Sequence, residues 1–584
     1  MLRRDFLAAP ALLTQASPAR PNVIVILSDD QGYGDLSAHG NPRLKTPNLD
    51  RLHGESVRLT DFHVAPMCTP TRAQLMTGRD CLTTAAMNVS SGRTLLRRDL
   101  PTMPEIFAAN GYKTGIFGKW HLGDTYPYRP EDRGFQEAVW FPSSHVGSAS
   151  DAWNNDYFND RYRHNGKLEQ YKGYCTDVFF GEAMKWIRER AAGREPFFAY
   201  IPTNAPHGPL FVEEKYREMY KDLPRNVASF FGMIANLDEN LGRLEALLSE
   251  AGLRDNTLIV FMTDNGGTAG VDFFNARMRG RKIGLWEGGH RVPCFLRWPK
   301  AGLGGGREIK GLTAIQDLLP TFIDLCGLKA PVAAKFDGVN IRPLLRAQGP
   351  IPDRKLVVQF SRMGVGRPQF GDACVLWKKW RLVTNDRLYD VAADPAQQND
   401  VIAKHPDVAA SMRDHYARWW KEVEPRLDSF LPVHIGSDKE NPVLLSPTEW
   451  ADSFLDQAVQ IRRGEPRNGF WHVMVEEGGE YRFKLRRWPK EVAVPMRAGI
   501  PAHKGEDGVY PAGVALPVAK VRMVAGTREL AQDVGAEEEE AVFTLPLAEG
   551  WMKLQTWLCD RDGRELSGAY FVYAERIPPV RSRR

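Results

Sequence analysis

The stretch that decides the fold class of this 584-residue chain is Asn22-Val-Ile-Val-Ile-Leu27, followed directly by Ser28-Asp29-Asp30. An unbroken run of β-branched residues is typical of a parallel strand that is buried on both faces of a sheet. Three later runs repeat the pattern, because each is strand-like and is followed by residues that can do chemistry: residues 114–117, 197–201 and 257–262. The sequence therefore predicts a buried sheet with polar side chains after its strands.

Helical patterns lie between these runs. Apolar residues recur at helical spacing in residues 102–110, 174–190 and 228–251, and glycines follow the first and the last of these segments. Strands that alternate with helices indicate an α/β protein with a mainly parallel sheet flanked by helices. Since ligands of such sheets bind outside the carboxyl ends of the strands, we expect the polar clusters to converge there.

The chain is too long for one hydrophobic core, and its pattern of predicted strands and helices changes along the sequence, which indicates several domains. Residues 1–20 precede an α/β domain at 21–350. Short strands and a helical stretch at 408–423 then predict a small antiparallel C-terminal subdomain at 351–424. We expect a connector at 425–449 and an appended β-sandwich-like domain at 450–584, where strand-length runs alternate with turn signals. A carbohydrate-binding role and a purely structural role are both open for that last domain.

Composition indicates an ordinary globular chain. Hydrophobic residues make up 43% and charged residues 26%, and the formal net charge is +5. Because no basic run is interleaved with aromatic residues, nucleic acid is not an expected partner. No segment reaches transmembrane length. The seven cysteines form no CxxC pattern, and their disulfide pairing cannot be read from the sequence.

The first twenty residues place Arg3 and Arg4 before a short, weakly apolar stretch that ends in small residues. This order is typical of a twin-arginine export signal, and it predicts a periplasmic or extracellular protein. A disordered N-terminus that happens to carry two arginines is the alternative.

Oxygen ligands follow two of the strand-like runs. Asp29 and Asp30 come after the first run, and Asp264 and Asn265 come after residues 257–262. Carboxylate and amide oxygens suit a hard cation, so the sequence predicts a site for Ca²⁺ or Mg²⁺. Paired acidic residues also cap helices, and for either pair alone that interpretation stays open.

A cysteine stands in the strongly punctuated stretch Pro66-Met67-Cys68-Thr69-Pro70-Thr71-Arg72. Pro70 fits the first position of a helix, with Thr69 as its cap. Cys68 would then lie beside free backbone N–H groups, which favour negative charge nearby. From this stretch alone, Cys68 is either a small buried hydrophobic residue or a reactive centre.

Basic and proton-transferring side chains also stand in stretches that contain glycine or proline. They are Arg72, Lys119, His121, His207 and Lys282. Each alone is more often structural or solvated. Together they describe a site for a tetrahedral oxyanion, in which a cation polarises the oxygens, lysines neutralise charge and a histidine protonates the departing alcohol.

Residues 127–173 are rich in Tyr, Trp, Asn and Asp without a clear period, which predicts a long loop over the site. The candidate sugar contacts in this loop are Trp140, His145, Asp151, Trp153 and Asp156. A loop that is packed by its own aromatic residues is the alternative.

Two motifs carry a family resemblance. The first is Cys68-Thr69-Pro70-Thr71-Arg72 followed by Leu75-Met76-Thr77-Gly78, and the second runs from Gly111-Tyr112-Lys113-Thr114 to Gly118-Lys119-Trp120-His121. They resemble the signatures of the type I, formylglycine-dependent sulfatases, which include the arylsulfatases and belong to the alkaline phosphatase superfamily. The resemblance covers residues 21 to about 424. Many members carry Ser at the position of Thr71.

The resemblance implies an alkaline-phosphatase-like fold and a sulfuric ester hydrolase. It implies that a maturation enzyme oxidises Cys68 to Cα-formylglycine, whose hydrate attacks sulfur. It also implies one calcium ion, with Mg²⁺ as second choice. The positions that match the calcium ligands are Asp29, Asp30, Cys68, Asp264 and Asn265.

The remaining polar positions match the catalytic residues of that family. Arg72 and Lys119 match the residues that steady the formylglycine hydrate, and His121 matches the group that helps to deprotonate it. His207 and Lys282 match the pair that binds sulfate and assists the leaving group, with His207 as the expected acid.

The expected substrate is a sulfated oligosaccharide or polysaccharide, because export, an aromatic loop and an added β-domain all suit a glycan. Neither the sugar, the sulfate position nor endo or exo action follows from the sequence. Two alternatives remain: a phosphate or phosphonate monoester hydrolase of the same superfamily, and an inactive glycan-binding homologue.

Overall fold

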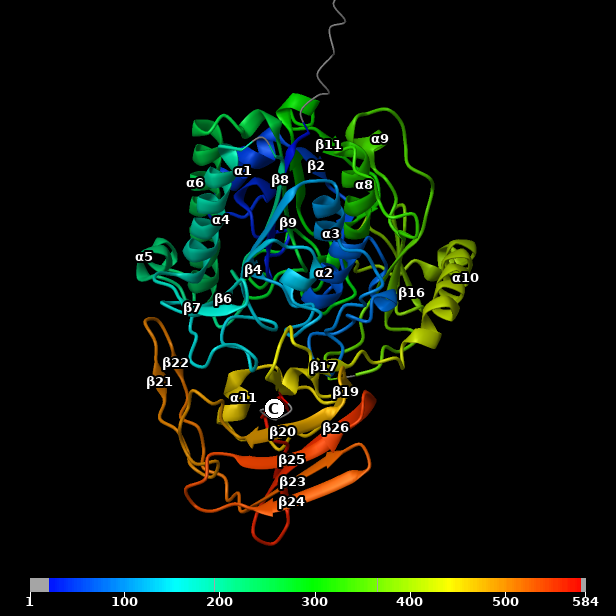
Figure 1. Cartoon of the computed structure of the whole chain (residues 1–584). Coiled ribbons are helices and arrows are strands. Elements are labelled where there is room, and N and C mark those ends of the chain that lie inside the picture. The colour runs from blue at the N-terminus through cyan, green and yellow to red at the C-terminus, as the bar shows by residue number, and fades with distance from the viewer. Residues whose placement is uncertain (1–19, 194, 365, 579–584) are drawn as a thin grey trace, which may run out of the picture.

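A ten-stranded sheet forms the centre of the computed structural model, which describes residues 20–193, 195–364 and 366–578 (Figure 1). Its strands lie in the order β11 (Glu308–Ile309), β2 (Val57–Leu59), β10 (Cys294–Arg297), β9 (Thr257–Thr263), β1 (Asn22–Ser28), β8 (Phe197–Pro202), β4 (Lys113–Lys119), β5 (Glu137–Phe141), β6 (Arg161–His164) and β7 (Lys167–Gln170). The five strands from β9 to β5 are parallel to one another. The predicted α/β class is confirmed, and β10, β6 and β7 add antiparallel pairs at the sides.

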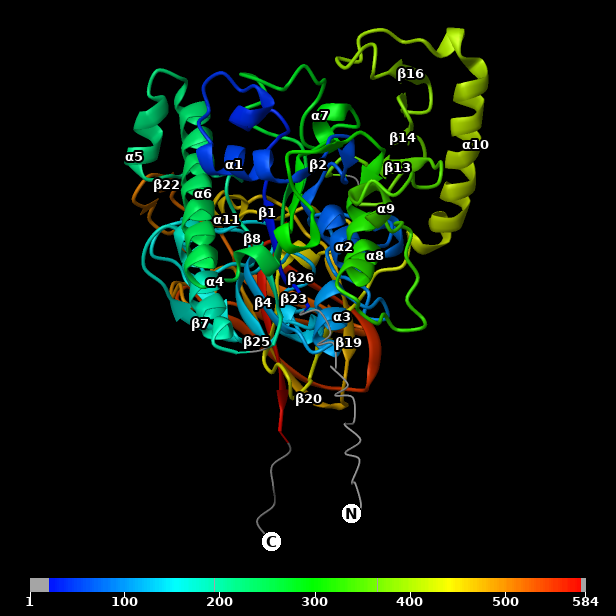
Figure 2. The ribbon, with the colours of Figure 1, turned by 90° about the horizontal axis from the view of Figure 1, so that it is seen from above.

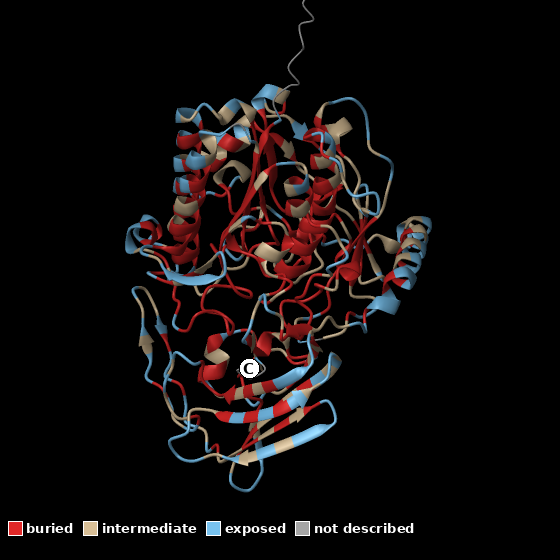
Figure 3. Cartoon of the chain, in the orientation of Figure 1, coloured by how far each residue is buried: buried red, intermediate tan, exposed pale blue. Residues whose placement is uncertain are grey.

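Both faces of the sheet are buried, as the β-branched run of β1 predicts. Ile24 and Ile26 pack in a hydrophobic cluster with helices α1 (Pro47–Glu55), α4 (Cys175–Ala191) and α6 (Arg225–Glu250). The alternate residues Val23 and Val25 pack with α2 (Cys68–Thr77), α3 (Met103–Ala109) and α8 (Leu318–Leu325). Figure 2 shows these two helix groups on opposite sides of the strands, and Figure 3 shows the buried residues gathered between them.

The local sequence explains where the helices begin and end. Thr102 and Glu105 form a reciprocal capping box at the start of α3, and Gly111, with φ +75°, follows its end. Helix α2 begins at Cys68, two residues before the predicted start, so Thr69 is not its cap. Pro70 is then the third helical residue. It is tolerated there because the first four N–H groups of a helix have no partner within the helix.

Residues 127–173 are not one long loop. They contain β5 and the hairpin of β6 and β7, which extends the sheet. The hairpin escaped prediction because its strands, Arg-Tyr-Arg-His and Lys-Leu-Glu-Gln, are short and mostly polar, and all four residues of β7 are exposed, so the apolar signal of a strand is weak. The irregular part is shorter, from residue 142 to residue 160.

A four-stranded antiparallel sheet follows the ten-stranded sheet in the chain. It consists of β13 (Leu356–Gln359), β14 (Ala373–Trp377), β15 (Trp380–Val383) and β16 (Arg387–Asp390). Val375 and Leu382 pack with Met412 and Tyr416 of α10 (Pro406–Val423). Residues 351–424 thus contain the predicted sheet and helix.

The C-terminal residues form two further sheets that share a hydrophobic cluster with residues such as Trp471 and Phe483. One sheet has the order β17 (Val433–Ile435), β19 (Phe470–Val475), β26 (Gly550–Cys559), β23 (Lys520–Ala525) and β24 (Arg528–Asp533), with β27 (Glu565–Ser567) on β26. The other has the order β18 (Val443–Leu445), β28 (Phe571–Ile577), β20 (Gly479–Arg486) and β25 (Ala541–Leu547). Strands β17 and β18 lie in residues 425–449, so the segment expected as a connector adds one strand to each sheet.

The shorter elements lie between these layers or on the surface. They are β3 (Phe62–His63), β12 (Thr313–Ala314), β21 (His503–Lys504), β22 (Val509–Tyr510), α5 (Glu214–Arg217), α7 (Glu287–His290), α9 (Arg342–Leu345) and α11 (Ala458–Arg462).

The two C-terminal sheets lie below the carboxyl ends of the parallel strands (Figure 1). Trp153, between β5 and β6, packs edge-on against Trp488 and Phe571. Among the described residues, no helix is both long and apolar enough to cross a lipid bilayer. The predicted export signal at 1–20 lies outside the described residues except for Arg20.

Candidate active site

The parallel strands deliver the predicted polar residues to one edge of the sheet. Asp29 and Asp30 follow β1, Asp264 and Asn265 follow β9, and Lys119 ends β4. Ligand atoms of Asp29, Cys68 and Asp264 lie within 4.8 Å of one another. The first turn of α2 therefore meets the ends of β1 and β9, as expected for a parallel sheet.

Hydrogen bonds join Asp30 to Asp264 and to Asn265. The Asp30 backbone N–H donates to Asp264 Oδ1 over 3.2 Å, and Asn265 Nδ2 donates to Asp30 Oδ1 over 2.9 Å. Asp30 has a left-handed backbone, with φ +69°. Such a conformation in a non-glycine residue is held in place by surrounding structure and is typical of functional sites.

Two oxygens of this cluster have no hydrogen-bond donor. Asp29 Oδ1 and Asn265 Oδ1 are buried without a partner, and both residues are fully inaccessible to solvent. Burial, together with Asp29, raises the pKa of Asp264 to about 6. Buried acceptors without donors are costly, and a hard cation is the ligand that carboxylate and amide oxygens best satisfy. The residues present therefore fit a Ca²⁺ or Mg²⁺ ion.

Three basic side chains surround the same carboxylates. Arg72 Nη2 lies 2.8 Å from Asp264 Oδ2 and 3.4 Å from Asp29 Oδ2, and Lys119 also pairs with Asp29. Lys282 Nζ lies 2.5 Å from Asp30 Oδ1. Positive charge is thus concentrated where an anionic substrate would meet the acidic cluster.

Cys68 is the first residue of α2 and is 1% exposed. Burial raises the pKa of its thiol, although Lys119 and Lys282 lower it. A protonated, buried thiol is a poor nucleophile. The geometry therefore gives no support to direct attack by a Cys68 thiolate.

His121 lies close to the chain reversal after β4. Its Nε2 lies 3.2 Å from the Val89 carbonyl oxygen, and its Nδ1 is buried without a partner. Burial and then Lys119 lower its pKa well below the usual value. The backbone can reach this place because residue 118 is glycine, since a Cβ there would lie 2.0 Å from the Pro202 carbonyl oxygen. His121 is thus a neutral imidazole with a free acceptor nitrogen.

His207 follows β8 and faces Asp30. Its Nδ1 lies 2.6 Å from the Gly208 carbonyl oxygen, which can only accept, so Nδ1 carries a hydrogen. Its Nε2 lies 3.8 Å from Asp30 Oδ2. Burial lowers its pKa to about 3, with Asp30 raising it and Lys282 lowering it. The Nε2 atom is therefore the one that can take up or give a proton.

The predicted sugar contacts separate into two groups. His145 stacks on His207, with ring centroids 5.1 Å apart, and so lies at the site. Asp151 instead accepts hydrogen bonds from Gly147 and Ala152 backbone N–H groups and holds its own loop closed. Trp153 is 6% exposed and packs against the C-terminal sheets.

The two remaining candidates also have structural partners. Trp140 is fully buried in β5. Asp156 lies 3.0 Å from His503 Nε2 of β21. A role of any of the five in sugar binding remains a prediction.

Sequence reasoning missed several contacts of the site. Tyr200 in β8 lies beside Arg72 and helps to hold the pKa of that guanidinium above its usual value against the effect of burial. Asn204 Oδ1 accepts the Val146 N–H over 3.0 Å and fixes the loop that carries His145. Asp456, from the C-terminal part, binds the serine next to His145.

A second buried cluster lies around α7. His63 Nδ1 and His290 Nδ1 are 2.9 Å apart, and a Glu287 carboxylate oxygen lies within 4.8 Å of both rings' ligand atoms. Arg381 lies 2.7 Å from both Glu287 and Asp61. Burial alone would raise the pKa of Glu287, but Arg381 lowers it to about 2. This cluster is a paired network of charges.

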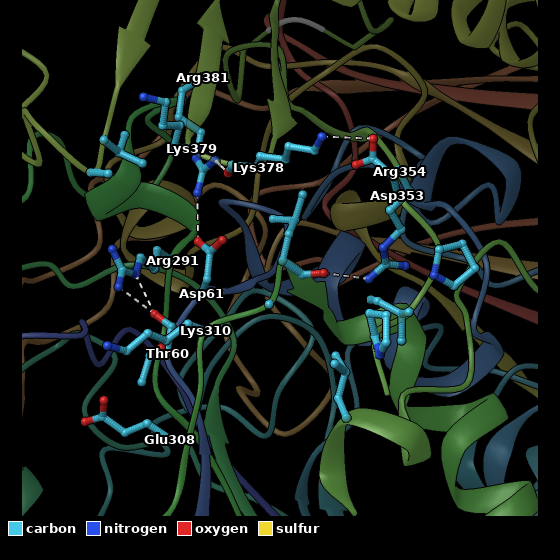
Figure 4. A pocket seen from close by; sticks show the side chains of 18 of the residues that line it. Thr60, Asp61, Arg291, Glu308, Lys310, Asp353, Arg354, Lys378, Lys379 and Arg381 are labelled. Carbon is cyan, nitrogen blue, oxygen red and sulfur yellow. Dashed lines mark hydrogen bonds and ion pairs between the residues drawn. The ribbon is translucent and has the colours of Figure 1, made fainter. Parts of the chain in front are cut away.

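Asp61 and Arg381 also line a pocket of about 820 Å³ between the ten-stranded sheet and the β13–β16 sheet (Figure 4). Its basic side chains are largely paired: Arg354 with Asp317 and Lys378 with Asp353.

Comparisons with known proteins identify the family of the first part of the chain. Residues 21–328 match the family model described as Sulfatase. N-acetylgalactosamine-6-sulfatase of Rattus norvegicus is 30% identical over 380 residues, covering 60% of this chain and 70% of that protein. The ulvan-active sulfatase of Formosa agariphila is 28% identical, covering 71% of this chain and 83% of that protein.

The solved structure of Ps i-CgsB in complex with k-i-k-neocarrahexaose is similar to this chain, with a TM-score of 0.63 and 28% identity. The similarity covers 68% of this chain and 92% of that one. The shared part does not extend over the whole chain.

Proposed function

Because this chain belongs to the sulfatase family of the alkaline phosphatase superfamily and is thereby a sulfuric ester hydrolase, we propose that it removes sulfate from a sulfated glycan, using a formylglycine made from Cys68 and one calcium ion. The observation that carries the proposal is the pair of buried, unpartnered acceptors, Asp29 Oδ1 and Asn265 Oδ1, in the cluster that also contains Cys68. These atoms need a cation, and the cation would lie beside the modified residue.

The residues that would hold calcium are Asp29, Asp30, Asp264 and Asn265, together with residue 68. When present, calcium would supply positive charge that polarises sulfate oxygens, and the formylglycine hydrate would supply a hydroxyl nucleophile. The raised pKa of the Cys68 thiol supports a role as precursor rather than as thiolate nucleophile. A maturation enzyme would be required for the oxidation.

Residues of the chain itself would orient the reacting groups. Arg72 and Lys119 hold Asp29 in place and leave positive charge at residue 68. His121 Nδ1, a buried acceptor without a partner, would accept a proton from the residue 68 hydrate. Each of these groups is pre-positioned by the ends of β4 and α2.

His207 and Lys282 would bind the sulfate group. Lys282 Nζ and His207 Nε2 both lie beside the Asp30 carboxylate, at 2.5 Å and 3.8 Å. The low pKa of His207 applies to the site without an anion, and a bound sulfate ester raises it by favouring the imidazolium. His207 Nε2 would then protonate the departing alcohol oxygen.

The glycan part of the proposal is supported by three relatives. Their names refer to N-acetylgalactosamine 6-sulfate, to ulvan and to a neocarrahexaose complex. We further propose that residues 1–20 export the folded protein after modification.

Sulfate release tests the function. Protein matured by a formylglycine-generating enzyme and supplied with Ca²⁺ is incubated with a panel of defined sulfated oligosaccharides, and free sulfate is measured. The proposal predicts release from at least one glycan and far slower hydrolysis of a matched phosphate ester. Faster phosphate hydrolysis would favour the phosphomonoesterase alternative, and no turnover by fully modified protein would favour a glycan-binding homologue.

A further inference from the structure

The C-terminal part of the chain supplies a buried carboxylate to the loop that carries His145. Asp456 lies between β18 and α11 and is 6% exposed. Its Oδ1 accepts hydrogen bonds from Ser144 Oγ over 2.7 Å and from Ser143 Oγ over 3.2 Å. Its backbone carbonyl accepts the Ala149 N–H over 2.8 Å. Asp456 therefore contacts this loop on both sides of His145.

The contact continues to the candidate active site. Ser144 Oγ lies 2.7 Å from His145 Nδ1, and the His145 ring stacks on His207 with an angle of 19° between the planes. The series of contacts Asp456, Ser144, His145 and His207 thus connects the appended sheets to the residue that is proposed to bind sulfate.

The direction of these hydrogen bonds follows from the number of hydrogens available. Ser144 has one hydroxyl hydrogen, and a carboxylate can only accept it. When Ser144 donates to Asp456, its oxygen must accept from His145, so the hydrogen of His145 is on Nδ1. The Nε2 atom of neutral His145 is then a hydrogen-bond acceptor. Without the carboxylate, Ser144 is free to donate to Nδ1, and Nε2 would carry the hydrogen.

We propose that Asp456, acting through Ser144, fixes His145 in the tautomer that presents Nε2 as an acceptor beside His207, and that this acceptor selects sulfate esters with a hydroxyl group next to the sulfate. The inference rests on the proposed function, because it places the sulfate at His207 and Lys282. Asp456 is a positioning residue, since it acts on the substrate only through His145. A vicinal hydroxyl is a donor of the kind that sugars carry.

The test compares two substrates that differ in one hydroxyl group, phenyl sulfate and 2-hydroxyphenyl sulfate. Full-length, matured enzyme is assayed at pH 8, because burial raises the pKa of Asp456 and a higher pH favours its carboxylate form. Sulfate release gives kcat/KM for each substrate. The change Asp456→Asn places an amide donor beside Ser144 and should lower kcat/KM about fivefold more for 2-hydroxyphenyl sulfate than for phenyl sulfate, which is the effect of about one hydrogen bond. Ser144→Ala should shift the ratio in the same direction, and the double variant should shift it no further.

Asp507→Asn is the matched control. Asp507 is a buried carboxylate of the same C-terminal part, and it pairs with Arg217 and accepts the Val212 N–H, away from Ser144. This variant should leave the substrate ratio unchanged. Equal losses on both substrates in Asp456→Asn, or no change in the ratio, would overturn the inference alone. No sulfate release by the unaltered enzyme, from either aryl sulfate or from any glycan of the panel, would overturn the proposed function and the inference with it.

Discussion

Two buried clusters in the described part of the chain carry enough metal-binding side chains to hold a cation, and they differ in whether their polar atoms have partners. At the strand ends, Asp29 Oδ1 and Asn265 Oδ1 have none. Around α7, the rings of His63 and His290 are hydrogen-bonded to each other, and Arg381 donates a hydrogen bond to the Glu287 carboxylate. Both clusters are equally buried, so burial does not separate them.

The difference shows that the unpaired acceptors, rather than the number of ligands, indicate a metal site. Both oxygens of Glu287 have arginine partners, so a cation there would gain little and would disrupt the ion pairs. Asp29 differs, because Arg72 and Lys119 pair with its Oδ2 and leave its Oδ1 without a partner. A buried acceptor that has no donor stays costly until a cation or a proton arrives. The comparison makes separate predictions for the two clusters.

The largest effect is expected at the strand ends. Asp264→Ala removes a carboxylate that both Arg72 and the proposed cation need, so we expect loss of bound calcium and a fall in sulfate release of roughly 1,000-fold. Metal content by mass spectrometry and initial rates check this result. Glu287→Gln in the other cluster is the control and should keep its calcium. Calcium retained in Asp264→Ala would contradict the claim that the strand-end cluster, and not the α7 cluster, binds the cation.

A purely structural effect is expected around α7. Arg381→Leu leaves the buried Glu287 and the half-buried Asp61 without their shared partner, and the free energy of unfolding should fall by about 3–5 kcal/mol. Denaturant unfolding measures it, with metal content unchanged. Arg43→Leu, which breaks an exposed pair with Asp222, should cost less than about 1 kcal/mol. Similar losses in both variants would show that the α7 network does not stabilise the fold.

A smaller effect is expected where a buried carboxylate oxygen without a partner binds a proton instead of a cation. Glu449 accepts a hydrogen bond from Thr94, its Oε2 has no partner, and burial raises its pKa to about 8. Since the unfolded chain loses this proton at lower pH, the contribution of Glu449 to stability should decrease as pH rises from about 4.5 to about 8.

Glu449→Gln removes this pH dependence. The melting temperature of the variant relative to the unaltered protein should rise by about 1–3 °C between pH 5 and pH 8.5. A difference that stays constant with pH would mean that Glu449 is ionised in the folded protein.

Much of the fold was predictable because its signals are local. The run of β1 predicts a strand buried on both faces, and the caps of α3 predict its limits. The β6–β7 hairpin was missed because its strands are short and mostly polar, and β17 and β18 were missed because three-residue strands carry too little pattern.

The candidate site also contains residues that could be placed from the sequence and residues that could not. Residues that directly follow parallel strands, such as Asp29 and Asp264, could be placed together from topology alone. Asp456 could not, because its contact with Ser144 joins residues 312 positions apart on two different layers of the molecule. The packing of Trp153 against Trp488 depends on the same docking of the C-terminal sheets and was equally invisible.

The central claim is that Cys68 is the precursor of the reactive group beside the cation site. The most direct measurement is the mass of the tryptic peptide of residues 59–72 from active enzyme. We predict a peptide about 18 Da lighter than unmodified cysteine requires, the change expected for conversion of Cys68 to formylglycine. A peptide of full cysteine mass in enzyme that still releases sulfate would contradict the account.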